Sequence, residues 1–140
     1  MIVRNGYLLD TNVLSETRKK KAHEGVIAFL ESSEPSLFYL SVLTLGELRK
    51  GVAAKRRDDP DNAKRLSSWV DGLEFSFADR IVGIDAAAAR LWGEWSAERS
   101  RPVIDTLMAA CASSRRLTLV TRNVRDVRGL PVKTLSPWEE

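Results

Sequence analysis

Short apolar runs that alternate with amphipathic segments restrict the fold of this sequence more than any other feature. The runs have the length of buried strands and lie at residues 6–9, 37–40, 80–84, 117–121 and 132–135. Between them, apolar residues recur at helical spacing, as at Ile104, Leu107, Met108, Cys111 and Ala112. This alternation predicts an α/β fold, a three-layer α/β/α sandwich with a central and mostly parallel sheet.

Polar residues at the starts of the amphipathic segments indicate where helices begin. Ser41 and Asp85 follow predicted strands and are typical helix N-caps. We expect a short helix at 13–16 to continue into the basic run that follows it. A charged loop is expected at 56–60, with Asp61 capping the helix after it.

The length and composition fit one globular domain over residues 1–140. Hydrophobic residues make up 44% of the chain and charged residues 29%, which excludes the disordered, core-poor class. No apolar run approaches the roughly 20 residues that cross a bilayer, and the N-terminus has no apolar run of signal-peptide length. The single cysteine, Cys111, cannot form an internal disulfide, so we expect a cytoplasmic protein without a membrane partner.

Basic residues outnumber acidic ones only slightly, but they are clustered. The chain has 22 Lys and Arg against 19 Asp and Glu, a formal net charge of +3. Basic runs lie at 18–21, 49–50, 55–57 and 115–116. Such runs attract polyanions but also occur as ordinary solvated helix faces, so the composition permits a nucleic-acid partner without showing one.

Four carboxylates from distant parts of the chain are expected at one edge of the sheet. Asp10 ends the first predicted strand, and Glu47 lies about two turns into the helix after the second. Asp105 lies in the first turn of its helix, and Asp126 follows the strand at 117–121 by a short loop. Ligands of open α/β sheets bind beyond the carboxyl ends of the strands, where these four side chains would converge.

Each of these carboxylates also has a purely local interpretation. Asp10 could cap the following helix, and Glu47 could be a solvated helix residue. Asp105 could complement the positive end of a helix dipole, and Asp126 could form an Asx turn beside Asn123. No single position decides between these alternatives, so the hypothesis of a site depends on the convergence of all four.

A cluster of four carboxylates needs a cation, because like charges at short range oppose joint ionisation. Zinc is unsuitable, since Cys111 lies on an apolar helix face and His23 in an unrelated helix. Oxygen ligands favour Mg²⁺ or Mn²⁺, and Mg²⁺ commonly shares its coordination sphere with substrate phosphates. The chain has no Walker A loop, dinucleotide glycine fingerprint or Ser-His-Asp candidate. Phosphoryl hydrolysis with metal-activated water is therefore the expected chemistry.

Four sequence blocks resemble the signature blocks of PIN-domain proteins, and more narrowly those of VapC-type toxins from bacterial toxin–antitoxin pairs. The blocks are LLDTNVLSE at 8–16, LGELRKG at 45–51, PVID at 102–105 and TRNVRD at 121–126. They occur in the family's order and span nearly the whole chain. Any one block is a weak signal, whereas four in order are strong. One departure is Val127, which stands where an aromatic residue often follows the last aspartate.

The resemblance implies a Mg²⁺- or Mn²⁺-dependent endoribonuclease. It implies roles as metal ligands or metal organisers for four carboxylates, namely Asp10, Glu47, Asp105 and Asp126. We expect Asp10 and Asp105 to hold the metal, directly or through water. Hydrogen bonds from Asn12, and from Thr121 or Asn123, are expected to organise the site. The implied partners are an RNA substrate, an inhibitory VapB-like antitoxin protein and a second copy in a homodimer.

Other parts of this interpretation are less specific. Basic residues near the site in sequence are expected to contact RNA, namely Arg18, Lys19, Arg49 and Lys50. The helices at 42–57 and 61–78 offer apolar surface for the antitoxin, although core packing explains that surface equally well. Two other functions stay open, a metal-dependent phosphatase for a small substrate and a non-catalytic RNA-binding or interaction module. The lack of glycine-rich phosphate loops counts against the first, and the four carboxylates count against the second.

Overall fold

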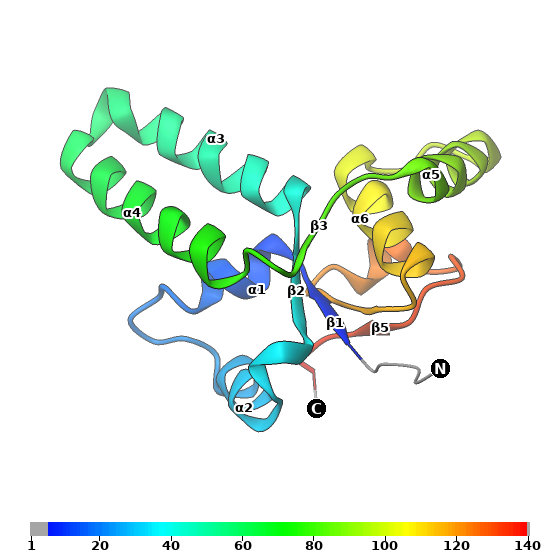
Figure 1. Ribbon diagram of the computed structural model, residues 1–140, viewed down its shortest axis with the longest axis horizontal. Helices are drawn as coiled ribbons and strands as arrows, with labels where there is room; N and C mark the ends of the chain where they lie inside the picture. Colours follow the sequence, from blue (N-terminus) through cyan, green and yellow to red (C-terminus); the bar gives the residue numbers. More distant parts are fainter. Residues whose placement is uncertain (1–5, 140) are drawn as a thin grey trace.

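The computed structural model describes residues 6–139 (Figure 1). The strands are β1 (Tyr7–Leu9), β2 (Phe38–Ser41), β3 (Ile81–Val82), β4 (Thr118–Val120) and β5 (Thr134–Leu135). The α-helices are α1 (Thr11–Glu16), α2 (Glu24–Ser32), α3 (Val42–Asp58), α4 (Pro60–Ser76), α5 (Ala86–Glu98) and α6 (Val103–Ser114). Two short 3-10 helices are η1 (Pro35–Leu37) and η2 (Val124–Val127). Strands therefore alternate with helices, as the apolar runs predict.

The five strands form one sheet in the order β3-β2-β1-β4-β5, and every pairing is parallel. β1 lies at the centre, with Tyr7 paired to Phe38 of β2 and Leu9 paired to Val120 of β4. The expected sheet is confirmed, and the run at 132–135 supplies β5 as an edge strand. Because the strands are parallel, their carboxyl ends meet at one edge of the sheet.

Helices cover both faces of this sheet and produce the predicted three layers. Successive strand residues point to opposite faces, so Leu8 and Leu119 pack into one apolar cluster with α5 and α6. Leu9 and Val120 pack into a second cluster with α1 and α2. Figure 1 shows α5 and α6 on one side of the strands and α1 and α2 on the other.

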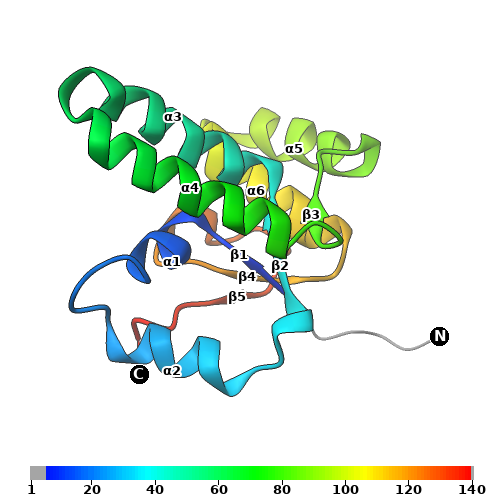
Figure 2. The ribbon, with the colours of Figure 1, turned by 60° about the vertical axis from the view of Figure 1, so that its left-hand side comes forward.

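Helices α3 and α4 form an antiparallel hairpin that projects from the sheet (Figure 2). Its contact is apolar, with Leu48, Val52 and Val70 buried between the two helices. The hairpin connects β2 to β3, so the first turns of α3 lie at the carboxyl edge of the sheet. That placement brings residues of α3 toward the end of β1.

The prediction of a loop at 56–60 is wrong. α3 ends at Asp58 and α4 begins at Pro60, so a single residue, Asp59, links the two helices. Asp59 caps α4 by accepting a hydrogen bond from the backbone N of Asn62 (3.2 Å), whereas Asp61 lies inside the first turn. Basic side chains in the last turn of α3 complement its dipole, and Pro60 fits the first position of a helix, so both helices extend fully.

Two other expected elements are shorter in the structure. α1 ends at Glu16 instead of continuing into the basic run, because the Glu16 carboxylate holds the following residues in a turn. It accepts a hydrogen bond from the backbone N of His23 (2.9 Å) and pairs with Lys19 (3.0 Å). β3 keeps only two residues of the run at 80–84, and Arg80, just before it, closes the turn after α4 with backbone and side-chain hydrogen bonds.

Two predicted helix starts are confirmed. Ser41 caps α3 by accepting a hydrogen bond from the backbone N of Leu43 (3.0 Å), and Asp85 caps α5 through that of Ala88 (2.9 Å). Within the described part of the chain, no helix has both the length and the apolar character needed to cross a membrane.

Candidate active site

Asp10 lies where the central strand leaves the sheet. Its backbone N–H donates to the carbonyl of Val120 (2.9 Å), which continues the β1–β4 pairing for one residue beyond Leu9. Its side chain is only 6% exposed and caps α1, with Oδ1 accepting a hydrogen bond from the backbone N of Thr11 (2.7 Å). The capping role of Asp10 is therefore real, but it uses only one of the two carboxylate oxygens.

The second carboxylate oxygen of Asp10 is held by two side chains. Oδ2 accepts hydrogen bonds from Thr121 Oγ1 (2.6 Å) and from Asn12 Nδ2 (3.3 Å). In turn, Asn12 Oδ1 accepts from the backbone N of Arg122 (3.3 Å), and Thr121 Oγ1 accepts from the backbone N of Asn123 (3.0 Å). The structure thus brings Asn12 and Thr121 to Asp10 through their side chains and Asn123 through its backbone.

Asp105 and Asp126 form a carboxyl pair at the same edge. Asp105 lies in the first turn of α6, and Asp126 lies in η2, directly beyond β4. Burial is the main cause that raises the pKa of Asp105 to about 6, and the negative charges of Asp10 and Asp126 add to it. A hydrogen bond to the carboxyl of Asp126 also favours the protonated form of Asp105.

Glu47 reaches this edge from α3 and is exposed. Its Oε1 accepts a hydrogen bond from the hydroxyl of Thr11, the residue after Asp10. The Thr11 hydroxyl also lies 3.1 Å from that of Thr44, a buried residue one turn before Glu47. These two threonines are not predicted from the sequence. Their only signals are that Thr11 adjoins Asp10 and that Thr44 shares a helix face with Glu47.

The four carboxylates influence one another electrostatically. Burial raises the pKa of Asp10, and the charge of Glu47 adds to this, while hydrogen bonds led by that from Thr121 lower it. The pKa of Asp105 is raised by the charges of the other three carboxylates. The four carboxylates therefore lie within electrostatic range of one another at the carboxyl edge of the sheet. A bound cation would relieve the repulsion among them.

The donor set at this edge suits a hard divalent cation. A narrow crevice lies at this edge. Its polar lining consists of Asp10, Asp105, Thr121 and Asn123, and its apolar lining of Met108, Leu119 and Val127. Oxygen donors of this kind fit Mg²⁺ or Mn²⁺. Among residues 6–139, no three His, Cys, Asp or Glu side chains converge on one point at ligand distance. An ion here would therefore keep several waters, as Mg²⁺ commonly does.

Arg49, one of the expected RNA contacts, is tied into the α3–α4 hairpin. Its guanidinium pairs with Asp71 and Glu74 of α4 and donates a hydrogen bond to Ser67 Oγ (3.3 Å). Two carboxylates compensate its charge, so the geometry favours a role in the hairpin over one in RNA binding. Lys50, beside it on α3, is exposed.

The other expected basic contacts follow α1, whose N-terminus is capped by Asp10. Arg18 is exposed, with its guanidinium carbon 4.9 Å from the ring centroid of Trp69. Lys19 is also exposed and pairs with the buried carboxylate of Glu16. Both residues stay candidates for contact with a polyanion.

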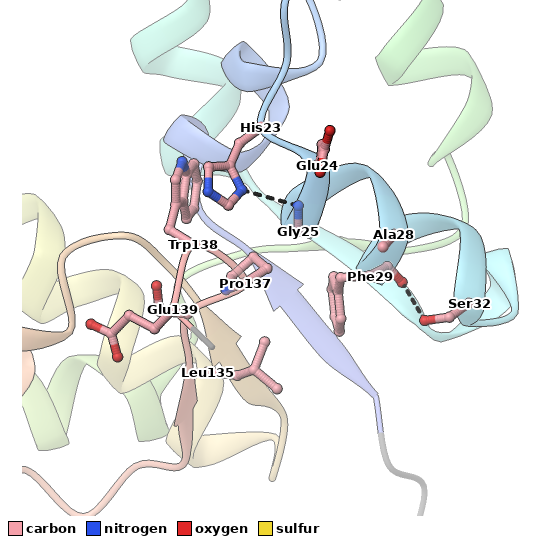
Figure 3. Close-up of a pocket in the computed structure, with 11 residues that line it drawn as sticks. His23, Glu24, Gly25, Ala28, Phe29, Ser32, Leu135, Pro137, Trp138 and Glu139 are labelled. Atoms are coloured by element: carbon pink, nitrogen blue, oxygen red, sulfur yellow. Dashed lines mark hydrogen bonds between the residues drawn. The ribbon is translucent and has the colours of Figure 1, made fainter.

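A larger groove, of about 880 Å³, lies between α2 and the C-terminal segment. Figure 3 shows its lining, which includes His23, Phe29, Leu135 and Trp138. None of the four carboxylates lines it. The groove is therefore separate from the acidic edge, although Trp138 also contacts Arg122, which lies near that edge.

Comparison with known proteins identifies the family. Residues 7–128 match the PIN domain family, a span that includes all four carboxylates. The chain belongs to the PIN-domain family. The fold agrees with that of solved family members. The crystal structure of FitAcB from Neisseria gonorrhoeae matches with 29% identity and a TM-score of 0.86, over 96% of this chain and 99% of that one.

Relatives of this PIN-domain protein extend over nearly its whole length. Toxin FitB of Neisseria gonorrhoeae is 32% identical over 95% of this chain and 99% of its own. The VapC ribonuclease Y4jK of Sinorhizobium fredii is 30% identical over 94% and 97%, respectively. The plasmid stability protein StbB of Pseudomonas syringae pv. tomato is 28% identical over 94% and 98%. The resemblance inferred from the four sequence blocks is confirmed.

Proposed function

We propose that this PIN-domain protein is a divalent-metal-dependent endoribonuclease and the toxin of a toxin–antitoxin pair. The observation that supports the proposal is that four carboxylates from distant chain segments lie at one edge of a parallel sheet, close enough for the charges of three to raise the pKa of the fourth, Asp105. The names of the relatives, a VapC ribonuclease and Toxin FitB, support RNA as the substrate and toxicity as the role. On this proposal residues 1–140 are a single nuclease domain.

The metal would be Mg²⁺ or Mn²⁺, held by Asp10 and Asp105 directly or through water. Glu47 and Asp126 would complete the acidic shell around it. When bound, such an ion supplies positive charge that activates water and stabilises charge developing on the phosphodiester. The oxygen-only donor set and the mutual repulsion of the carboxylates support this assignment.

The chain's own residues prepare this site before any ligand arrives. Thr121 and Asn12 fix the orientation of the buried Asp10 carboxylate, so little rearrangement is needed when it binds a cation. Thr11 holds the exposed Glu47 against the start of α1. Burial and the neighbouring charges raise the pKa of Asp105 to about 6, so this carboxyl is partly protonated near pH 6 in the metal-free protein, and it would release the proton when a cation binds.

An antitoxin partner and a homodimer complete the proposal. Structures similar to this chain include a toxin–antitoxin complex from Klebsiella pneumoniae, at 26% identity and a TM-score of 0.67. We infer a VapB-like antitoxin that covers the acidic edge and contacts the apolar surface of α3 and α4. The homodimer stays a prediction. An RNA substrate and the free, buried thiol of Cys111 fit a cytoplasmic protein.

The test is cleavage of a mixed panel of tRNAs and rRNA stem-loops by antitoxin-free protein with Mg²⁺ or Mn²⁺. We expect discrete cuts that disappear with EDTA and in Asp105→Asn. Asp61→Asn is the matched control, because it makes the same chemical change at an exposed position of the α3–α4 hairpin. It should cleave like the wild type.

Other outcomes would favour the alternatives. Hydrolysis of p-nitrophenyl phosphate without RNA cleavage would indicate a phosphatase. RNA binding without cleavage of any panel member would indicate a non-catalytic module. Cuts that persist in both Asp105→Asn and EDTA would contradict the assignment of the carboxylate site.

A further inference from the structure

Arg122 lies inside the fourth sequence block, but neither the block nor the acidic site assigns a role to its side chain. It directly follows Thr121, and its backbone N donates a hydrogen bond to Asn12 Oδ1 (3.3 Å). Thr121 and Asn12 both hold Asp10, so the main chain of Arg122 belongs to the carboxylate network. Its side chain, in contrast, is exposed. A long cationic side chain thus leaves the protein surface right beside the acidic site.

The indole of Trp138 supports this side chain. The guanidinium carbon of Arg122 lies 5.4 Å from the ring centroid of Trp138, within the range of a cation–π contact. Such a contact uses the face of the guanidinium and leaves the N–H groups on its edge available. Among residues 6–139, the guanidinium has no ion pair within 4.0 Å and donates no hydrogen bond.

Trp138 is itself held in place by α2 (Figure 3). A Cβ on Gly25 would lie 2.2 Å from the carbonyl oxygen of Pro137, so the C-terminal segment packs directly on the first turn of α2. The ring of Trp138 lies 6.4 Å from that of His23, the residue that caps α2. The Trp138 indole also packs against the apolar cluster formed with α1 and α2. Arg122 therefore rests on a platform anchored to two elements.

The local charge balance leaves Arg122 without a full counter-charge. Glu16 is 5% exposed and already pairs with Lys19 (3.0 Å). The positive charges of Lys19 and Arg122 both contribute to lowering the pKa of Glu16. Lys19, and not Arg122, thus forms the ion pair with Glu16, so the Arg122 guanidinium stays available to an anion from solution.

We propose that Arg122 binds a backbone phosphate of the RNA strand beside the acidic site, with Trp138 positioning its guanidinium. This inference rests on the proposed ribonuclease function. Four carboxylates repel a polyanion, so the strand needs a cation close to where it approaches them. A guanidinium matches phosphate with two parallel N–H groups, and its prior stacking on Trp138 reduces the entropy lost on binding.

The test measures binding of a fluorescein-labelled, random-sequence 12-nucleotide RNA in EDTA, where metal-dependent cleavage is absent. Kd is measured over a range of NaCl concentrations, because each phosphate contact contributes about 0.7 to the slope of log Kd against log salt. Arg122→Ala should weaken binding about fivefold at low salt and reduce the slope by about 0.7. Arg122→Lys keeps the charge and should keep the slope, with a smaller loss of affinity.

Arg90→Ala is the matched control, because Arg90 is an exposed arginine on α5 and lies outside the basic runs. It should leave Kd and slope unchanged. The substitution at Arg122 spares the backbone hydrogen bond to Asn12, and thermal unfolding verifies that each variant folds. A purely structural role of Arg122 would lower the melting temperature without moving the salt slope.

If Arg122→Ala keeps the wild-type Kd and slope, the proposal is overturned, whatever the cleavage assay shows. It is also overturned if only binding of an acidic peptide from an antitoxin changes. If the wild type cleaves no RNA but Arg122→Ala reduces the slope, the proposed function fails and the phosphate contact stands. Where cleavage is observed, Arg122→Ala should raise KM and leave kcat nearly unchanged.

Discussion

At the scale of single residues, the two carboxylate oxygens of Asp10 have different partners. One carboxylate oxygen caps α1, and the other is held by Thr121 and Asn12. Residue type alone does not separate the two oxygens, so the sequence presents capping and participation in a site as alternatives. The burial of Asp10 makes the hydrogen bonds necessary, since an unpartnered carboxylate in the interior is costly.

Removing one of these hydrogen bonds should affect the chemistry more than the fold. Thr121→Val keeps the shape of the buried side chain and deletes the donor to Asp10 Oδ2. We expect cleavage activity or metal affinity to fall roughly 10–100-fold, as for other residues that orient metal ligands. Thr118→Val, on the same strand, is the control and should be near wild type. Full activity of Thr121→Val would contradict the orienting role.

The protonation of Asp105 should make the stability of the metal-free protein depend on pH. Its pKa is raised from 3.8 to about 6, so the folded protein binds this proton more tightly than the unfolded chain. The resulting stabilisation is complete below about pH 4 and is lost as the pH rises through 6. Asp105→Asn, which carries no charge, should therefore melt roughly 3–5 °C above the wild type at pH 7.5 without metal, a figure reduced for partial exposure.

Thermal unfolding between pH 4 and 8 in EDTA measures this effect. The difference between Asp105→Asn and the wild type should vanish by pH 4, while Asp61→Asn should show no comparable trend. Superimposable curves for Asp105→Asn and the wild type at all pH values would contradict the raised pKa of Asp105.

At the scale of secondary-structure elements, the hydrophobic pattern predicts which segments are strands and helices but not where they end. The end of α1 depends on Glu16, whose carboxylate binds a backbone N seven residues later. The α3–α4 connection depends on whether Asp59 or Asp61 caps the second helix, and both are plausible caps by residue type. Such choices are made by three-dimensional contacts that no local pattern contains.

The same limit applies to the candidate site. Parallel strand ends predict that Asp10, Asp105 and Asp126 meet, because each lies next to a strand end or in the first turn of a helix at the sheet edge. The contact of Glu47 with Thr11 depends instead on how the α3–α4 hairpin sits on the sheet. Likewise, the carboxylates that form ion pairs with Arg49 lie on α4, more than twenty residues away in sequence.

The docking of the C-terminal segment on α2 can be tested with a pair of glycines. A Cβ at Gly25 would lie 2.2 Å from the carbonyl oxygen of Pro137, so Gly25→Ala must displace backbone. We expect it to lower the free energy of unfolding by about 1–3 kcal/mol. Gly72→Ala, at an open position inside α4, should instead raise it by about 0.5–1 kcal/mol.

Urea denaturation of both variants provides this measurement. Opposite signs for the two substitutions are the expected result. Equal stability of Gly25→Ala and the wild type would mean that the C-terminal segment is not fixed against α2.

At the scale of the whole molecule, the parallel sheet brings residues that are distant in sequence close together in space. Its five strands all end at one edge, so carboxylates at positions 10, 47, 105 and 126 act on one another although they are far apart in the chain. The net charge of +3 and the acidic edge are compatible, because the basic residues lie elsewhere on the surface or, like Arg122, at the border of that edge. On the proposed function, the fold would separate attraction of RNA from the chemistry performed on it.

The central claim is that these four carboxylates form one divalent-metal site, and Mn²⁺ titration by calorimetry tests it most directly. The account predicts that the wild type and Asp61→Asn bind Mn²⁺ with the same affinity. Asp10→Asn and Asp105→Asn should bind at least about tenfold more weakly, with thermal unfolding confirming that each variant folds. Equal Mn²⁺ affinity in all four proteins would contradict the account, because the metal would then be held elsewhere.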